Sequence, residues 1–319
     1  MMDALKFDQK EQEIIKRNMD KTPDHIFDIH SHVFLNSTLQ DELKNTLAFN
    51  EFSFQDLQEA KETLYPWKDV EFLSFPQPQK SEPHIKNNND YVKSWAKNKL
   101  LFWTINTPIQ EELADDTWSW IKVYGFNNDS IQSNISLETL EILNQRGAIL
   151  LIHLPVNIIV NQQELWSLLS KYKNIKFVVA HGWNVQKCKN NYEWYKNALQ
   201  YLRRYENLGF DVSCVNDKDY MELLLNTFDI NRIYYWSDLP ISLLKWAVLP
   251  WNNWQGEIIT KPCLEELDNW IREKIIKAYH LDLDNLVNIQ QYTISLLWEL
   301  LNEKQAEKVY YENAKNLNI

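Results

Sequence analysis

Short apolar runs recur along the chain, and many of them end in a residue that can carry chemistry. Ile149-Leu-Leu-Ile-His153 and Phe177-Val-Val-Ala-His181 are two examples. Continuous apolar runs of this kind are typical of strands that are buried on both faces of a parallel sheet. The pattern predicts eight strands, near residues 26–33, 70–75, 99–105, 119–124, 148–153, 176–181, 209–214 and 232–238.

Amphipathic segments separate the later strands, at residues 136–146, 162–173 and 217–228. Successive strands in this part of the chain begin roughly 30 residues apart, which is the room that one strand, one helix and two loops need. Eight alternating strand–helix units predict an α/β fold of the (β/α)8 TIM-barrel type. We expect a single domain over residues 1–319, with the barrel strands within 26–240 and a helical extension at 241–319.

The first predicted strand carries two histidines, in Asp28-Ile-His30-Ser-His32. Residues i and i+2 of a strand point to the same face, so Asp28, His30 and His32 are expected to project together. Two imidazoles about 6–7 Å apart along a strand can converge on one divalent metal ion. The sequence therefore predicts a metal site that involves the first strand.

Four later strands carry further candidate groups, which are Lys122, His153, His181 and Asp238. The active site of a TIM barrel lies at the C-terminal ends of its strands, so these side chains are expected to meet the two histidines of the first strand there. Lys122 stands within an apolar run, and a lysine is almost never fully buried unless it is paired. All four residues are therefore candidates for a common site.

The order and spacing of these segments resemble those of the metal-dependent amidohydrolase superfamily. The closer similarity is to its amidohydrolase-related (amidohydrolase 2) branch, which contains small-molecule hydrolases and decarboxylases. The matching motifs are Asp28-x-His30-x-His32, Ile-Lys122-Val-Tyr, Ile-His153, Ala-His181-Gly and Ser237-Asp238-Leu-Pro240, and residues 307–314 resemble the closing helix of the family. The resemblance implies a metal-dependent enzyme built on a TIM barrel.

The resemblance also implies roles for individual residues. The metal ligands that it implies are His30, His32, His153 and Asp238. Asp238 would also take the proton from the attacking water, and His181 would polarise the substrate carbonyl or bind a second metal. A carbamate on Lys122 would bridge two ions, the second of which His153 and His181 would hold. We expect one ion, because Ser-Asp-x-Pro and Lys-x-Tyr resemble the branch in which one metal is usual.

The ligand types bear on the metal and on the reaction. Imidazole and carboxylate groups suit Zn²⁺, with Mn²⁺ and Fe²⁺ as alternatives. Such an ion lowers the pKa of a bound water towards ~7. We therefore expect hydrolysis of a C–O or C–N bond in a small organic substrate, such as a lactone, a cyclic amide or an ester.

Two other functions stay open at this point. A non-oxidative decarboxylase of an aromatic or enoic acid would use the same scaffold, but it should offer an arginine that binds the substrate carboxylate. None of the arginines in the chain clearly follows a strand, which favours hydrolysis. The third function is a catalytically inactive barrel that binds a ligand or a protein. The intact set of histidine, lysine and aspartate residues argues against it.

Composition narrows the classes of partner. The formal net charge of −11 and the pI of about 5.2 argue against a nucleic-acid surface, which needs clustered positive charge. No apolar stretch approaches the ~18 residues of a membrane span, and the N-terminal residues lack a signal-peptide core. The three cysteines show no paired spacing and suit a reducing compartment. We expect a cytoplasmic enzyme with a small-molecule substrate, and a homo-oligomer stays open.

Overall fold

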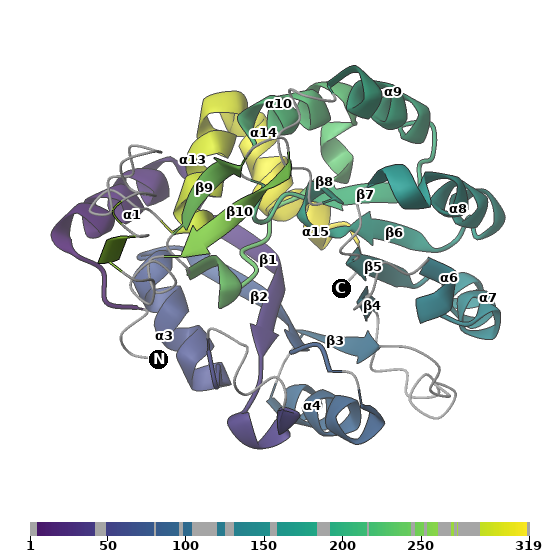
Figure 1. Cartoon of the computed structure of the whole chain (residues 1–319), viewed down its shortest axis with the longest axis horizontal. Coiled ribbons are helices and arrows are strands. Elements are labelled where there is room, and N and C mark those ends of the chain that lie inside the picture. Colours follow the sequence, from purple (N-terminus) through teal and green to yellow (C-terminus); the bar gives the residue numbers. More distant parts are fainter. Residues whose placement is uncertain are drawn as a thin grey trace.

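The computed structural model shows a ring of strands with helices around it. It describes residues 5–41, 49–79, 81–95, 98–103, 120–124, 131–153, 158–183, 192–215, 217–243, 246–251, 254–260, 269–270, 273 and 288–317. Eight parallel strands form one sheet in chain order, and Figure 1 shows them as the inner ring. Their bounds are β1 His25–Val33, β2 Asp69–Pro76, β3 Asn98–Trp103, β4 Trp120–Tyr124, β5 Ile149–His153, β6 Lys176–Val179, β7 Leu208–Asp211 and β8 Ile233–Tyr234.

Hydrogen bonds join the first strand to the residues that follow the last one. The backbone N–H of Asp238 donates to the carbonyl of His30 at 2.8 Å, and the N–H of His32 donates to the carbonyl of Leu239 at 2.7 Å. Each predicted strand overlaps one of the observed strands β1 to β8. The prediction of a (β/α)8 TIM barrel is therefore confirmed.

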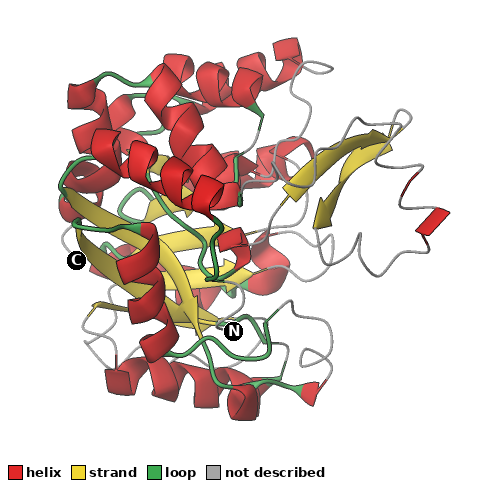
Figure 2. Ribbon diagram, turned by 90° about the vertical axis from the view of Figure 1, so that its left-hand side faces the viewer, coloured by secondary structure: helices red, strands yellow, loops and turns green. Residues whose placement is uncertain are grey.

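Helices form the outer layer of the barrel (Figures 1 and 2). Their bounds are α1 Gln9–Lys21, α3 Phe54–Leu64, α4 Glu82–Trp95, α6 Ile131–Asn134, α7 Leu137–Arg146, α8 Ile158–Lys171, α9 Tyr192–Leu202, α10 Lys218–Thr227, α13 Ile289–Leu300, α14 Glu303–Glu307 and α15 Asn313–Lys315. Short 3₁₀ turns cover Asn36–Thr38, Ala180–Trp183, Ile230–Arg232 and Ile241–Leu243, and a π-helical turn covers Lys308–Glu312. The three predicted amphipathic segments correspond to α7, α8 and α10.

Local sequence signals set the ends of these helices, as α7 shows. The hydroxyl of Ser136 accepts a hydrogen bond from the N–H of Thr139 and so caps the first turn. Gly147 ends the helix with a φ of 65°, a left-handed conformation that glycine adopts without steric strain. The chain then enters β5 after one residue.

The barrel strands bury apolar side chains on both of their faces. In β1, Phe27 and Ile29 pack inside the barrel with residues such as Leu151 of β5. Ile26 and Val33 of the same strand belong to the outer core, between the sheet and the helices. Full burial of a side chain of this size contributes ~1.5–3 kcal/mol, so the two cores hold the strand ends in place.

A bulge interrupts β1 between Asp28 and Ser31, an interval that contains His30. Asp28 pairs with Phe72 of β2 and Ser31 pairs with Ser74, so β1 has one extra residue in this interval. The alternation of faces shifts there, and the carboxylate of Asp28 meets the hydroxyl of Tyr65, a residue of the outer core, at 3.2 Å. Asp28 therefore does not share the face of His30 and His32, contrary to the prediction.

The segment after β8 is not helical throughout. Strands β9 (Trp246–Trp251) and β10 (Trp254–Thr260) form an antiparallel hairpin before the helices α13 to α15. Figure 2 shows this hairpin beyond the arrowheads of the barrel strands. The predicted helical extension omitted it, although its tryptophan and β-branched residues favour strands. Within the described ranges, no helix has the length and apolar character needed to cross a membrane.

Candidate metal centre

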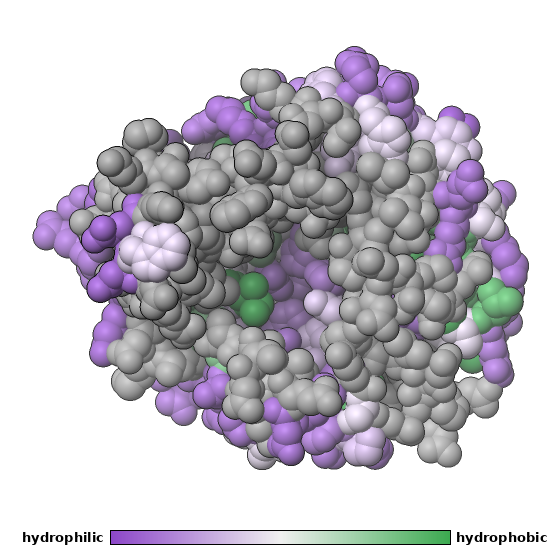
Figure 3. Space-filling view, viewed as in Figure 1, coloured by the Kyte–Doolittle hydropathy of each residue, from purple (hydrophilic) through white to green (hydrophobic). Residues whose placement is uncertain are grey.

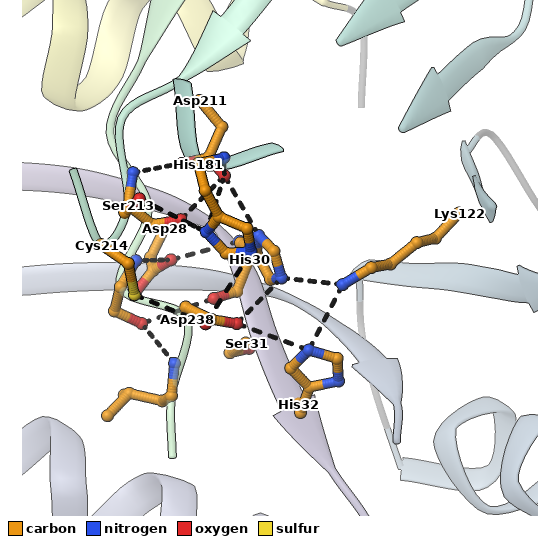
Figure 4. A network of polar contacts seen from close by, with 12 residues as sticks. Asp28, His30, Ser31, His32, Lys122, His181, Asp211, Ser213, Cys214 and Asp238 are labelled. Atoms are coloured by element: carbon orange, nitrogen blue, oxygen red, sulfur yellow. Dashed lines mark hydrogen bonds and ion pairs between the residues drawn. The ribbon is translucent and has the colours of Figure 1, made fainter. Parts of the chain in front are cut away.

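Polar side chains converge where the barrel strands end. Figure 3 shows a hollow in the middle of the face seen in Figure 1, in which the described residues are mostly hydrophilic, with hydrophobic atoms at its left edge. Figure 2 shows that the strands run towards this face. The network in Figure 4 combines side chains of β1, β4 and β7 with side chains that follow β6, β7 and β8.

His30, His32 and Asp238 form the centre of the network, and all three are buried. Nε2 of His30 lies 3.0 Å from Oδ1 of Asp238, and Nε2 of His32 lies 3.5 Å from the same oxygen. Ligands arranged tetrahedrally around Zn²⁺ at ~2.0–2.1 Å are separated by roughly 3.3 Å. The spacing of the three atoms therefore fits a divalent ion, and they form one of the groups that could hold a metal.

The partners of each ring indicate which nitrogen carries the hydrogen. Nδ1 of His32 lies 3.1 Å from the carbonyl oxygen of Pro76, which can only accept, so Nε2 presents a lone pair. Nδ1 of His30 lies 3.3 Å from Oδ2 of Asp211. A metal-binding histidine usually makes this kind of bond through its other nitrogen, because the bond fixes the ring and its tautomer. Both rings are therefore oriented as ligands.

Asp211, the last residue of β7, organises the side of the site that contains His181. Its carboxylate accepts the backbone N–H groups of His181 and Ser213 and the hydroxyl of Ser213. Because the hydroxyl of Ser213 donates to Asp211, it accepts from Nδ1 of His181, at 2.8 Å. Nε2 of His181 then presents a lone pair and lies 4.0 Å from Oδ2 of Asp238.

Unusual backbone conformations support three of these side chains. His181, Cys214 and Asp238 have φ values of 56°, 55° and 59°. Among the described residues other than glycine, only Trp67 also has a positive φ. A conformation of this kind costs ~1–3 kcal/mol, and such residues tend to cluster at functional sites. Their position at the ends of β6, β7 and β8 marks this end of the barrel as functional.

Burial and neighbouring charges set the protonation of the site. Burial, followed by the nearby Lys122, lowers the pKa of His32 to about 4 and that of His30 well below its usual value. Burial would raise the pKa of Asp238, but contacts with the histidines hold it well below the usual range. Burial also raises the pKa of Asp211, while its three donors favour the carboxylate. Neutral imidazoles beside an ionised Asp238 are the forms that bind metals.

Lys122 of β4 reaches the same atoms from another side (Figure 4). Its Nζ lies 2.8 Å from Nε2 of His30, 3.3 Å from Nε2 of His32 and 3.9 Å from the centre of the Phe75 ring. The residue is fully buried, and burial lowers its pKa to about 7 although nearby carboxylates favour the charged form. Lys122 therefore offers a hydrogen to the same lone pairs that could bind an ion.

His153 lies beside the network without joining it. Its ring stacks on Tyr124 with centroids 4.2 Å apart and meets the ring of His181 at 4.8 Å. Its Nδ1 is buried and has no hydrogen-bond partner in the described part of the chain. His153 belongs to none of the groups of described residues whose ligand atoms lie within 4.8 Å of one another. Its role as a metal ligand stays a prediction.

Cys214 is a member of the site that was not predicted from the sequence. Its Sγ lies 3.5 Å from Oδ2 of Asp238. A signal was present, because the predicted strand at 209–214 ends in three polar groups, Asp211, Ser213 and Cys214. The same reasoning that singled out the ends of the other strands would have found it.

A cavity of about 860 Å³ lies away from this network, at the opposite end of the barrel. Lys176 and Leu208, which begin β6 and β7, and Arg232, which directly precedes β8, line part of it. None of the candidate site residues contacts it. Because catalytic groups of TIM barrels lie at the C-terminal ends of the strands, the histidine cluster is the better candidate for the active site.

The fold and the site define a class of protein, a (β/α)8 barrel with histidines and an aspartate at the C-terminal ends of its strands. Residues 86–317 match the family model described as Amidohydrolase, the amidohydrolase 2 family. The chain therefore belongs to this family, as the sequence motifs predicted, and it is an enzyme of the amidohydrolase type. The family is metal-dependent, and the described residues include groups that could hold an ion.

Solved structures of similar fold span nearly the whole chain. Amidohydrolase 2 from Bifidobacterium longum subsp. infantis is 13% identical with a TM-score of 0.56, covering 93% of this chain and all of its own. A probable 2-pyrone-4,6-dicarboxylic acid hydrolase from Acinetobacter baumannii is 12% identical with a TM-score of 0.61, covering 92% and 98%. The 5-carboxyvanillate decarboxylase of Sphingomonas paucimobilis is 10% identical with a TM-score of 0.52, covering 92% and 99%. No curated protein matches the chain by sequence.

Proposed function

We propose that this enzyme hydrolyses a C–O or C–N bond in a small organic substrate, such as a lactone, a cyclic amide or an ester. The observation that carries the proposal is the convergence of two imidazoles on one carboxylate oxygen. Nε2 of His30 and Nε2 of His32 lie 3.0 and 3.5 Å from Oδ1 of Asp238. Two neutral imidazoles and one carboxylate are a ligand set for a hydrolytic Zn²⁺, with Mn²⁺ or Fe²⁺ as alternatives.

The residues divide the work between binding an ion and moving a proton. When bound, a divalent ion supplies Lewis acidity that makes water a better nucleophile and polarises a carbonyl. His30 and His32 present their lone pairs to it, and their Nδ1 bonds hold the rings in place. Asp238 would bind the ion together with the two histidines, and its carboxylate would be the group that accepts the proton that the nucleophile loses.

The hydrogen bonds of His181 favour one of its two predicted roles. To polarise a carbonyl by donating a hydrogen, Nε2 of His181 would have to be protonated. Its Nδ1 already donates to Ser213, and burial lowers the pKa of the ring, so the neutral form with a lone pair on Nε2 is favoured. His181 is therefore better suited to accept a proton or to bind an ion than to act as an electrophile.

The positions of the arginines favour hydrolysis over decarboxylation. A carboxylate substrate calls for a guanidinium near the metal. None of the arginines in the described ranges lies in a loop that follows the C-terminal end of a barrel strand. They lie within a helix, just after a helix or directly before a strand: Arg17, Arg146, Arg203, Arg204 and Arg232. Arg272 lies outside the described residues.

One ion at His30, His32 and Asp238 is the minimal site. Lys122 leaves the alternative of a bridged pair open, because its pKa of about 7 gives a substantial fraction of neutral amine near pH 7. A neutral amine is the form that can react with carbon dioxide to give a carbamate. The number of bound ions therefore separates the two arrangements.

The test combines metal analysis with a substrate screen. Protein purified without chelators should contain close to one equivalent of a divalent transition metal by mass spectrometry, and the variants His30→Ala and His32→Ala should lose it. A panel of lactones, cyclic amides, esters and aromatic acids should show turnover of a carbonyl substrate with no release of carbon dioxide. Metal-free protein that hydrolyses the same substrate at full rate would overturn the proposal.

A matched control separates the loss of a ligand from a general loss of folding. His25 begins β1, at the other end of the strand from His32, and its exposed ring lies 3.2 Å from the carboxylate of Asp69, whereas the network is buried. His25→Ala should keep both the metal content and the turnover of the wild type. If His25→Ala loses metal to the same extent as His30→Ala, the assignment of the ligands is wrong.

A further inference from the structure

We propose that His181, Cys214 and Asp238 form a second cation site, which binds a thiophilic divalent ion such as Zn²⁺ and shares the carboxylate of Asp238 with the first site. The proposal rests on the proposed function only in taking His30, His32 and Asp238 as the first site. It differs from the arrangement bridged by Lys122 in its ligands, because a thiolate replaces the carbamate and Asp238 makes the bridge.

The two oxygens of Asp238 face different groups of ligand atoms (Figure 4). Oδ1 lies next to Nε2 of His30 and of His32, at 3.0 and 3.5 Å. Oδ2 lies 3.5 Å from Sγ of Cys214 and 4.0 Å from Nε2 of His181. A carboxylate placed between two such groups is the usual bridge of a two-metal site, in which the ions are ~3.5–4 Å apart.

The ring of His181 is oriented for this second group. Its Nδ1 donates to the hydroxyl of Ser213 at 2.8 Å and lies 3.3 Å from the carbonyl of the same residue. The lone pair of Nε2 is therefore directed away from these partners, towards Oδ2 of Asp238. The ring of His181 also contacts the ring of His153, with centroids 4.8 Å apart, so its neighbour on that side is a neutral imidazole and not a cation.

The three candidate groups of described residues do not have equal claims. The group made of His30, His181 and Asp211 uses Nδ1 atoms, which already donate to Asp211 and Ser213. The oxygens of Asp211 are also occupied, because they accept two backbone N–H groups and one hydroxyl. Only the groups on either side of Asp238 therefore have ligand atoms that are free to bind an ion.

Cys214 makes the second group selective. The thiol can donate its hydrogen to Oδ2 of Asp238, and this bond alone would explain the contact of 3.5 Å without any ion. An ion would replace that hydrogen, so that Sγ binds as a thiolate and one proton is released to solvent. Thiolate ligands favour Zn²⁺ over Mg²⁺, Ca²⁺ and Mn²⁺. The two explanations therefore differ in whether the sulfur contacts a metal.

Co²⁺ provides a direct probe of that contact. The variant Cys188→Ser/Cys263→Ser leaves Cys214 as the single cysteine of the chain. Titration of its apoprotein with excess Co²⁺ should fill the first site and then bind a second equivalent, beyond the one that the protein retains on purification, and this second equivalent should produce the near-ultraviolet absorption of thiolate-to-cobalt charge transfer. Adding Cys214→Ser should remove this absorption and one of the two equivalents, while circular dichroism shows that the fold is kept.

Variants of the first site separate this inference from the proposed function. In the single-cysteine protein, His30→Ala/His32→Ala should lose one equivalent of Co²⁺ and keep the charge-transfer absorption. One bound equivalent without that absorption in the single-cysteine protein would overturn the second site and leave the proposed hydrolase intact. Charge-transfer absorption in an enzyme whose turnover is unaffected by His30→Ala would support the second site and overturn the proposed function.

Discussion

The two ends of the barrel use polar side chains in opposite ways. At the N-terminal ends of the strands, polar side chains donate hydrogen bonds to backbone carbonyls. Nδ2 of Asn313 donates to the carbonyls of Ile230 and Ile233 at 2.6 and 2.8 Å. The side-chain amide of Asn207 likewise donates to three carbonyls at the end of α8 and just after it, those of Leu169, Tyr172 and Ile175. The amide hydrogens of these two residues therefore stabilise the bottom of the barrel.

At the C-terminal ends, the polar groups face one another. Nε2 of His30 and Oδ1 of Asp238 are both lone-pair atoms in the tautomer that the other bonds favour, yet they lie 3.0 Å apart. Only a cation relieves the repulsion between such atoms, and Lys122 supplies one for the imidazoles. Polar side chains that bond to the backbone stabilise the fold at the N-terminal end of the barrel. Polar side chains that face one another at the C-terminal end can bind a ligand.

The substitution with the largest expected effect is Asp238→Asn at the functional end. Asparagine keeps the shape and one oxygen, but it removes the negative charge and the group that accepts a proton. We expect weaker metal binding and a fall in kcat on the order of 10²-fold or more, the scale of general-base loss. Steady-state kinetics on a substrate from the panel, together with the metal content, would measure both effects.

Asp28→Asn is the matched control for this change, since it makes the same substitution on the outer side of β1. Asp28 accepts hydrogen bonds from Tyr65 and from the backbone of Ser237. The variant should bind metal like the wild type and keep its kcat within about tenfold. Near-normal turnover of Asp238→Asn with loss of activity in Asp28→Asn would show that the roles of the two aspartates are reversed.

The next effect concerns the other end of the barrel. Asn313→Ala removes the side-chain hydrogen bonds to the carbonyls of Ile230 and Ile233, although the carbonyl of Ile230 keeps the N–H of Ile233, and a buried group that loses its partner costs ~1–3 kcal/mol. We expect the free energy of unfolding in urea to fall by about 2 kcal/mol, with metal content and kcat unchanged. Lys308→Ala is the control, because it removes an exposed hydrogen bond to Asn231 and should change stability by less than ~0.5 kcal/mol.

The barrel could be predicted from sequence because its signal is local and repeated. The run of four apolar residues together with the His153 that follows it has the same bounds as β5, Ile149–His153. The last strand shows the limit of such signals, since the predicted segment 232–238 forms sheet only at Ile233–Tyr234. Beyond it, Tyr235 N donates to the carbonyl of Val309 and Asp238 N to that of His30. Those partners lie far away in the sequence, so no local pattern encodes them.

The site was predictable as a set of residues, but its geometry was not. The spacing of the strands was enough to predict that His30, His32 and Asp238 lie at the same end of the barrel. The bulge that turns Asp28 outward depends on the pairing of β1 with β2, which a single strand does not reveal. The tautomers of the histidines depend on Pro76, Asp211 and Ser213, whose proximity arises from the closed barrel.

The smallest expected effect tests the cation that the chain itself places among the ligand atoms. Lys122→Met keeps an unbranched side chain of nearly the same length, but removes the amino group that lies next to His30 and His32 and over the Phe75 ring. Like charges near each other repel, and an effective dielectric constant near 20 still leaves an interaction of a few kcal/mol at ~4 Å. In the wild type, the lysine can lower this repulsion by moving away from the ion, so only part of it weakens metal binding. We therefore expect the metal affinity of the first site to rise on the order of tenfold in the variant.

Calorimetric titration of the apoprotein with Zn²⁺ would measure this change. Lys308→Met removes the same charge from the exposed contact with Asn231 and should leave the affinity unaltered. A variant Lys122→Met that binds one equivalent fewer than the wild type would instead establish that Lys122 carries a bridging group. In that case the contrast between the two ends of the barrel would be sharper still, because a buried lysine at the functional end would act as a ligand, whereas Asn313 and Asn207 only stabilise the fold.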